Sequence, residues 1–78
     1  MNYEVIVQLK KEVLDPEGRA IKESLGRLGL GSLRDVQVSK RFVIEIDDND
    51  KDPDGTADHI AKEFLANPVS QTYQIRKL

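Results

Sequence analysis

Hydrophobic and polar residues alternate at the start of the chain, over residues 3–10, which read YEVIVQLK. One side of this segment carries the apolar residues Tyr3, Val5, Val7 and Leu9. A period of two is typical of a β-strand with one buried face. The pattern therefore predicts a strand that packs one face against the rest of the domain.

A helix is predicted to follow and to begin at Asp15. The Asp15 carboxylate can accept hydrogen bonds from the free amides of a helix start, and Pro16 suits the first helical position because no N–H is needed there. The apolar stripe of this helix is narrow and consists of Ile21, Leu25 and Leu28, with Ala20 and Ser24 at its edge. Gly18 and Gly26 each weaken a helix interior by about 1 kcal/mol relative to alanine. We therefore expect packing on a sheet to hold this helix, and Gly29 and Gly31 to end it, because both can take a positive φ.

Two further alternating runs lie within residues 36–47, which read VQVSKRFVIEID. The first run has Val36 and Val38 on one face. The second run has a face made of Phe42, Ile44 and Ile46. We place a tight turn near Ser39 and Lys40, between two strands, although the dipeptides that most favour hairpins are absent there.

A polar, acidic segment, DDNDKDPDGTAD, leads into a second predicted helix. The apolar residues with helical spacing in this helix are Ala57, Ile60, Ala61, Phe64 and Leu65. Asn67 and Pro68 are expected to end it. The last residues, TYQIRKL, predict a final strand with Tyr73 and Ile75 on one face.

The same helix start occurs twice, because the pattern Asp-Pro-x-Gly-x-Ala at residues 15–20 recurs at residues 52–57. Each half of the chain reads as strand, helix, strand, so the predicted order is β-α-β-β-α-β. A doubled unit in so short a chain favours the α+β class, with an antiparallel sheet and both helices on one face, as in ferredoxin-like folds. We expect residues 1–78 to form this single domain.

Size and composition make self-association the expected support for such a fold. A chain of 78 residues is marginally stable alone, because it buries only about 60% of the surface that its unfolded form exposes. The chain has no cysteine for disulfides, and a single histidine leaves too few ligands for a tetrahedral zinc site. An oligomer remains among the supports that small domains use.

Charge and hydropathy bound the expected partners and location. The net charge of −2, with both signs spread along the chain, gives no basic stripe for nucleic acid. Residues 1–12 carry charges where a signal peptide needs an unbroken apolar segment, and no run approaches the ~18 apolar residues of a membrane span. We expect neither nucleic acid nor a membrane as partner, and the absence of cysteine suits a reducing cytoplasm.

Two local patterns could carry chemistry. Residues 50–55, DKDPDG, match the first half of a calcium loop, but Ala61 stands where the closing glutamate belongs. A solvated turn that also caps the second helix is the favoured interpretation, and calcium is the alternative. His59, the only histidine, is expected to face solvent and has no evident orienting partner for base catalysis.

No self-contained active site is evident. The chain lacks cysteine, a serine beside a recognisable base, and a phosphate-binding G-x-x-x-x-G-K-[ST] loop. The basic residues with potential to form a patch are Lys10, Lys11, Lys40 and Arg41, although clusters of this size are usually solvated surface. An RNA-binding sheet needs exposed aromatics, whereas Tyr3, Phe42 and Tyr73 are expected to face the core. We predict no catalytic residue, no metal site and no cofactor bound by this chain.

The segments VLDPEGRAIKESLGRLGL, VQVSKRF and FLANPVSQTYQI resemble the PurS family, the small subunits of phosphoribosylformylglycinamidine synthase in bacteria and archaea. The resemblance covers essentially the whole chain. It is carried by the order of elements, by residues 13–20 after the first strand, and by residues 65–69 before the last strand. The chain departs from the family pattern at Gln37, Ser39 and Gln71.

The resemblance implies a role in purine synthesis, at the step that amidates formylglycinamide ribonucleotide with glutamine and ATP. In the family, a glutaminase subunit releases ammonia, a large synthetase subunit uses it, and the small subunit joins the two as a dimer or tetramer. ATP and magnesium then belong to the synthetase subunit, while this chain holds two active sites close enough for ammonia transfer. The alternative is a regulatory domain that senses a small molecule.

The expected contact residues follow from the same pattern. For self-association we expect apolar positions on exposed strand faces, since one layer of helices covers only one face of a sheet. These positions are Ile6, Val43 and Leu78. The expected contacts with partner subunits are Asp15, Pro16, Gly18, Lys40, Arg41, Asn67, Pro68 and Val69. Helix starts and stops explain Asp15, Pro16, Asn67 and Pro68 equally well.

Overall fold

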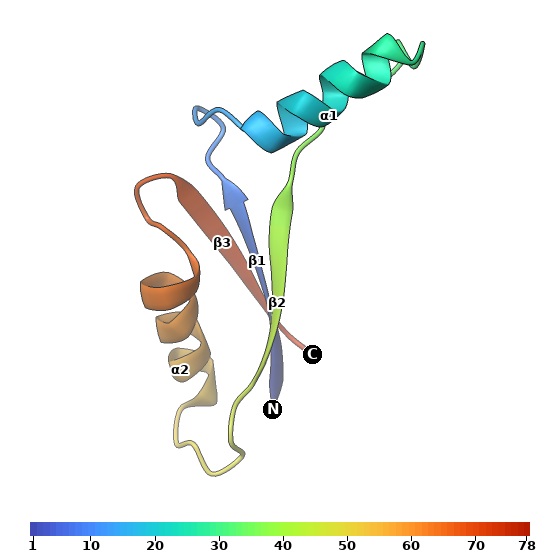
Figure 1. Cartoon of the computed structure of the whole chain (residues 1–78). Coiled ribbons are helices and arrows are strands. Elements are labelled where there is room, and N and C mark those ends of the chain that lie inside the picture. Colours follow the sequence, from blue (N-terminus) through green and yellow to red (C-terminus); the bar gives the residue numbers. More distant parts are fainter.

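The computed structural model describes all 78 residues and contains one antiparallel sheet and two helices (Figure 1). The strands are β1 (Asn2–Leu9), β2 (Ser39–Glu45) and β3 (Gln71–Lys77), in the order β2-β1-β3. The helices are α1 (Pro16–Arg27) and α2 (Pro53–Ile60), and a π-helical segment, Ala61–Leu65, continues α2. The α+β class and the antiparallel sheet with two helices are confirmed.

The core lies between the sheet and α2. The central strand β1 buries Tyr3, Val5 and Val7, as the alternation predicts. The helix side contributes Ala57 and Ala61, which are fully buried and small enough to let α2 approach the sheet closely. The half-buried side chains that surround them are Phe42, Ile44, Ile60, Leu65, Tyr73 and Ile75.

The tight turn predicted near Ser39 and Lys40 is wrong, because β2 runs through both residues. Residues 34–38 extend the chain beyond β2 without pairing to another strand. The reason lies in the apolar positions 36, 38, 42, 44 and 46, whose period of two continues unbroken across the expected turn. A two-residue turn sets Val38 opposite Arg41 and so moves the two apolar runs to different faces. One long strand keeps them on the same face.

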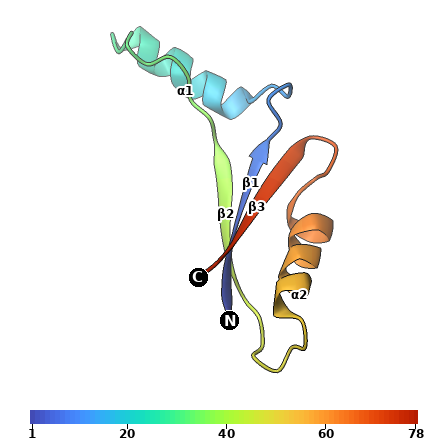
Figure 2. The same ribbon diagram turned by 180° about the vertical axis from the view of Figure 1, so that it is seen from behind.

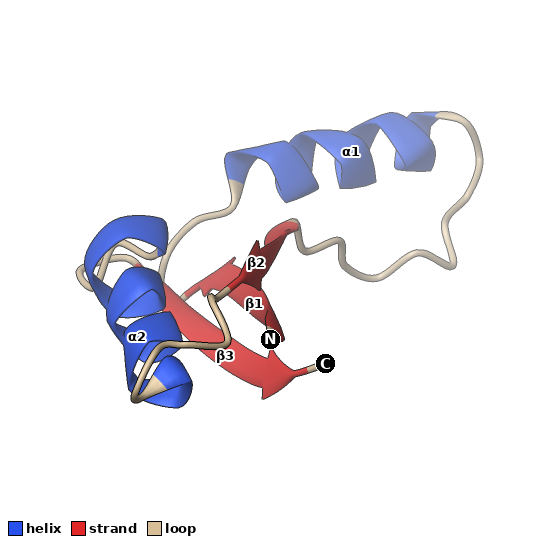
Figure 3. Ribbon diagram, turned by 90° about the horizontal axis from the view of Figure 1, so that it is seen from below, coloured by secondary structure: helices blue, strands red, loops and turns tan.

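Helix α1 begins and ends as predicted, but it does not lie on the sheet of its own chain. Asp15 is its N-cap, and Gly29, with a φ of +87°, follows its end. Figures 1 and 2 show α1 projecting from the end of the sheet, and Figure 3 shows it well apart from α2. Gly18 is the only buried residue of α1. Residues 34–38 continue straight into β2 without the predicted turn, so α1 does not contact the sheet. One helix rather than two therefore covers the sheet.

The molecule is consequently long and thin. Its extents are 53 × 24 × 13 Å and its radius of gyration is 16.3 Å. A compact domain of this length has a radius of gyration of about 11–12 Å. We call residues 15–38 the arm and the remaining residues, with the sheet and α2, the body. Neither helix has the length and apolar content needed to cross a membrane.

Candidate functional site

The sheet face opposite α2 carries a charged cluster at its centre. Glu4 on β1 accepts a hydrogen bond from Arg41 Nε on β2, at 2.5 Å, and lies 3.3 Å from Arg76 Nη2 on β3. Glu4 is only 8% exposed. The hydrogen bond from Arg41, helped by the charge of Arg76, holds the pKa of Glu4 below its ordinary value. An ionised Glu4 thus ties all three strands together on this open face.

Several predicted contact residues gather around this cluster. The strand register places Ile6, Arg41 and Val43 on the same face as Glu4. Val43 is 51% exposed, and Leu78, just after β3, is 55% exposed. Glu4 and Arg76 were not among the contact residues predicted from the sequence. A lone carboxylate within an apolar strand was the signal for Glu4, whereas Arg76 depends on a register that the sequence pattern does not contain.

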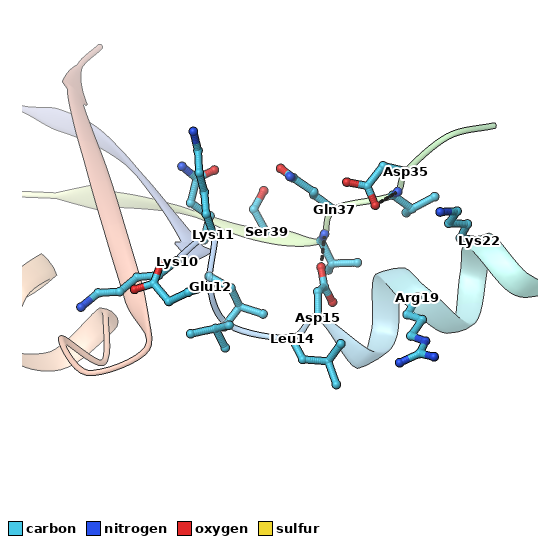
Figure 4. A pocket seen from close by; sticks show the side chains of 15 residues that line it. Lys10, Lys11, Glu12, Leu14, Asp15, Arg19, Lys22, Asp35, Gln37 and Ser39 are labelled. Atoms are coloured by element: carbon cyan, nitrogen blue, oxygen red, sulfur yellow. Dashed lines mark hydrogen bonds between the residues drawn. The ribbon is translucent and has the colours of Figure 1, made fainter. Parts of the chain in front are cut away.

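A second feature is the junction between the end of β1, the start of α1 and residues 35–39. An open depression of about 740 Å³ lies there (Figure 4). Asp15 Oδ1 accepts a hydrogen bond from Gly18 N and Asp15 Oδ2 accepts one from Val38 N, both at 2.9 Å. These amides, Gly18 first, hold the pKa of Asp15 below its ordinary value. Asp15 therefore caps α1 and also fastens it to the returning segment.

Gly18 is required at this junction by close packing. A Cβ atom at Gly18 would lie 2.2 Å from the carbonyl oxygen of Val36 and 2.8 Å from Asp15 Oδ2. No side chain fits at that distance from a backbone atom. Pro16 occupies the first turn of α1, as predicted. The positions of Asp15, Pro16 and Gly18 thus have a structural explanation within the arm.

The basic residues do not form one patch. Lys10 and Lys11 lie on the strand side of the depression, whereas Arg19 and Lys22 lie along α1, and the two pairs do not converge (Figure 4). Lys40 and Arg41 point to opposite faces of the sheet, because Lys40 pairs with Val7 and Arg41 pairs with Ile6. The predicted patch of Lys10, Lys11, Lys40 and Arg41 is therefore divided among three places.

The corner after α2 is exposed and internally bonded. Asn67 Oδ1 accepts a hydrogen bond from Val69 N at 3.0 Å, and Asn67 N donates one to Gln71 Oε1 at 2.7 Å. Val69 is 82% exposed, and Pro68 is also exposed. The departure from the family pattern at Gln71 thus has a local role, because its side chain fixes the corner.

Phe64 lies just before this corner and is 76% exposed, so its predicted place in the apolar stripe of the helix is wrong. The π-helical segment is the reason. Ala66 N donates to Ala61 O at 3.0 Å, and this wider turn directs Phe64 outward while Leu65 stays against the core. His59 is exposed, as predicted, and its ring meets that of Phe64 edge-on with the centroids 6.1 Å apart.

The acidic segment before α2 uses its carboxylates within the chain. Asp50 accepts hydrogen bonds from Asp52 N and from Thr56 Oγ1, both at 2.8 Å. Asp52 caps α2 by accepting one from Gly55 N, which confirms the predicted capping turn. Asp54 accepts a hydrogen bond from the Tyr3 hydroxyl. The structure contains no group of three or more His, Cys, Asp or Glu residues positioned to hold a metal ion.

The two tyrosines fasten α2 to the sheet. The hydrogen bond to Asp54, helped by burial, raises the pKa of Tyr3 to about 12. The Tyr73 hydroxyl donates to Asp58 Oδ1 at 2.6 Å, and this bond raises the pKa of Tyr73. Both rings lie on the face that packs against α2, as Phe42 does, which confirms that these three aromatic residues face the core.

The chain is similar to known proteins over almost its whole length. The PurS family model, described as phosphoribosylformylglycinamidine (FGAM) synthase, matches residues 2–78. The phosphoribosylformylglycinamidine synthase subunit PurS of Mycobacterium leprae is 44% identical over 73 residues, which cover 94% of this chain and 90% of that protein.

Two solved structures share the fold. PurS of Bacillus subtilis superimposes with a TM-score of 0.87 at 31% identity, over 96% of this chain and 94% of that one. PurS of Methanocaldococcus jannaschii, one of the subunits of formylglycinamide ribonucleotide amidotransferase in the purine biosynthetic pathway, gives a TM-score of 0.83 at 37% identity, over 96% and 92%. With such coverage the arm must superimpose along with the body. Sequence, fold and the shape of the arm agree, and the chain belongs to the PurS family of phosphoribosylformylglycinamidine synthase.

Proposed function

We propose that this chain is the bridging subunit of a phosphoribosylformylglycinamidine synthase and joins a glutaminase subunit to a synthetase subunit in purine biosynthesis. The complex amidates formylglycinamide ribonucleotide, consuming ATP and glutamine and releasing ADP, phosphate and glutamate. The observation that carries this proposal is the family match over residues 2–78. The comparisons do not favour the alternative of a small-molecule sensor.

The features of the chain support a share of the work that is geometric rather than chemical. Four side chains have shifted pKa values, and each of them uses its polar atoms in hydrogen bonds within the fold. They are Tyr3, Glu4, Asp15 and Tyr73. The chain therefore offers exposed surface for contacts with other subunits. Holding two active sites together raises the rate of the second reaction, because ammonia reaches it before escaping into solvent. ATP and magnesium are then held by the synthetase subunit.

We assign the contacts to two exposed regions of the body and to the arm. The open sheet face offers Ile6, Arg41, Val43 and Leu78, and the corner offers Asn67, Pro68 and Val69 together with Phe64. The junction residues Asp15, Pro16 and Gly18 set the direction of the arm, and Lys40 lies at its base. Copies of the chain associate with one another as well as with the two partner subunits.

Reconstitution tests the function. The purified glutaminase and synthetase subunits are assayed with and without this chain, once with glutamine and once with ammonium chloride as nitrogen source. We expect turnover with glutamine to require the chain and turnover with ammonium to proceed without it. Turnover with glutamine that is unchanged when the chain is omitted would overturn the bridging role.

A matched pair of variants tests the corner. Val69→Asp places a charge on an exposed apolar residue of the corner, and Asn49→Asp places the same charge on an exposed loop elsewhere. We expect V69D to lower glutamine-dependent turnover at least tenfold at limiting subunit concentration and N49D to leave it unchanged. Equal activity of both variants would remove the corner from the contact surface.

A further inference from the structure

We infer that the outer edge of β3 binds an extended segment of one of the two partner subunits as an added strand, and that this segment carries acidic side chains. The inference rests on the bridging role proposed above and specifies one surface that serves it. Three features of the structure support it: the unbonded backbone groups of β3, a pocket at the same edge, and the positive charge around both.

The backbone of β3 has unused hydrogen-bonding groups, because this outer strand pairs only with β1 (Figure 3). Leu78 N donates a hydrogen bond to Asn2 O at 2.9 Å, and at the other end of the pairing Lys10 N donates to the carbonyl oxygen of residue 70. Hydrogen-bonded and non-bonded pairs alternate in an antiparallel ladder, so the even-numbered residues of β3 bond to β1 and the odd-numbered ones point their amides outward. We call these outward groups the edge amides. They belong to Tyr73, Ile75 and Lys77.

Nothing in the sequence of β3 prevents another strand from using the edge amides. The strand reads QTYQIRK and contains no proline, which is the residue that most directly blocks pairing at a sheet edge. In the addition of a strand to such an edge, backbone hydrogen bonds supply affinity and pockets beside the edge supply specificity. A pocket at this edge would therefore indicate a particular ligand.

A pocket of about 310 Å³ lies at the start of this edge. Thr72 and Tyr73 both line it, although consecutive side chains of a strand point to opposite faces of the sheet, and no residue of β1 lines it. The pocket therefore opens at the edge of β3 rather than over either face. The remaining residues that line it are Lys62, Ala66, Pro68 and Gln71. Its volume is at the lower end of the range for ligand pockets, which suits a side chain of an added strand.

The charge at this edge is positive. Lys62 is the only charged residue that lines the pocket, and it is exposed and forms no ion pair within the chain. β3 itself contains two cationic residues, Arg76 and Lys77, and no acidic residue. Arg76 is exposed and uses only its Nη2 atom, toward Glu4.

This charge selects the kind of strand that the edge accepts. A second copy of β3 would bring the same cations to the edge, and like charges disfavour that pairing. An extended segment with acidic side chains is complementary instead. One carboxylate would enter the pocket beside Lys62, and another would meet Arg76 on the open face of the sheet.

Amide hydrogen exchange, resolved residue by residue, tests the pairing without any variant. In the chain alone we expect fast exchange at the edge amides and slow exchange at the even-numbered positions of β3, which bond to β1. The measurement is repeated with saturating glutaminase subunit and with saturating synthetase subunit. We expect one of them to slow exchange at the edge amides about tenfold or more. Slow exchange there in the chain alone would assign the edge to a second copy and overturn the inference.

A proline variant measures what the backbone bonds contribute. Lys77→Pro removes one edge amide, whereas Lys77→Ala keeps it, and both variants lose the contact of Lys77 with Asp54. We expect K77P to bind the subunit identified by exchange about tenfold more weakly than K77A, in biolayer interferometry, with the circular dichroism of the two variants alike. Equal affinity of two folded variants would overturn the inference. The exchange measurement on the natural chain decides the matter if K77P does not fold.

A charge-reversed pair tests the acidic character of the bound segment. Lys62→Glu reverses the charge at the pocket, and Lys51→Glu makes the same change at an exposed position before α2. We expect K62E to weaken binding of the same subunit about tenfold and K51E to leave it unchanged, with the difference shrinking as salt is added. Equal binding by the two variants would remove the acidic side chains from the inference.

The outcomes separate this inference from the proposed function. A complex that forms and turns over with glutamine, while the edge amides exchange as fast as in the chain alone, overturns the inference and leaves the bridging role intact. A chain that binds neither subunit overturns both.

Discussion

The two helices begin with the same capping motif but differ in how much of their surface is buried. Asp15 and Asp52 are both N-caps. Each is followed by a proline, and the carboxylate of each accepts a hydrogen bond from the amide of a glycine three residues later. Yet α2 and its continuation bury Ala57 and Ala61 completely, whereas α1 buries no side chain at all. A helix start therefore fixes where a helix begins but not what it packs against.

The segment after each helix accounts for the difference. After α2, the bonds of Asn67 to Val69 and Gln71 turn the chain back, so that β3 pairs with β1 and α2 is laid on its own sheet. After α1, the chain enters an apolar alternation that continues without a break into β2. No turn returns α1 to the sheet. The contrast shows that a missing turn, rather than a weak helix, produces the arm.

The largest expected effect breaks the packing of α2. Ala61→Leu forces three more heavy atoms into fully buried space beside Val5 and should cost about 3 kcal/mol of unfolding free energy. Ala20→Leu makes the same change on the exposed surface of α1 and should alter stability by less than about 0.5 kcal/mol. Urea denaturation of both variants measures the difference. Equal costs would mean that the two helices are buried alike.

A smaller effect is expected from two glycines of α1. Gly18→Ala meets the carbonyl oxygen of Val36 and should destabilise the arm by about 1–2 kcal/mol. Gly26→Ala meets nothing within 4 Å and should stabilise α1 by about 0.5–1 kcal/mol, because alanine favours a helix interior. Amide hydrogen exchange of residues in α1 measures both. A stabilising Gly18→Ala would show that the junction is not closely packed.

The sequence predicts most of the fold because its signals are local. The alternation in β1, the two capped helix starts and the final strand are each contained within about ten residues, and all are confirmed. The turn near Ser39 was the exception. The unbroken alternation from Val36 to Ile46 indicates one strand there instead. The side of the strand on which each apolar residue lies is enough to exclude the turn.

The candidate surface was less predictable, because it depends on register and on an irregular turn. Ile6 and Val43 could be chosen as exposed apolar positions, but their gathering around Glu4 follows from the pairing of three strands. Phe64 has helical spacing with Ile60, and only the bond between residues 61 and 66 takes it out of the core. Long-range pairing and a π-helical turn leave no short pattern in the sequence.

The attachments of the two helices also differ in the pH that breaks them, and alkali should release α2 first. Tyr3 has a pKa of about 12 in the folded chain and about 10 when unfolded, so its protonated hydroxyl contributes full stability below pH 10 and loses it between pH 10 and 12. We expect Tyr3→Phe to flatten the fall in stability over this range. Tyr73→Phe should act in the same direction. An unchanged alkaline limb in Tyr3→Phe would contradict the role of the Asp54 bond.

Acid should release the arm first. The pKa of Asp15 is lowered in the folded chain, so its carboxylate contributes stability above the ordinary aspartate value near 4 and loses it as the pH falls below that value. Asp15→Asn keeps an N-cap without a charge, and we expect a small loss of stability at pH 7 together with a weaker response of the Gly18 and Val38 amide signals to acid. Asp52→Asn is the matched change at the start of α2 and should leave those two signals as they are. If the Gly18 and Val38 amides respond to acid identically in all three proteins, the arm is held by packing rather than by the carboxylate. Its direction would then not depend on the cap that α1 shares with α2.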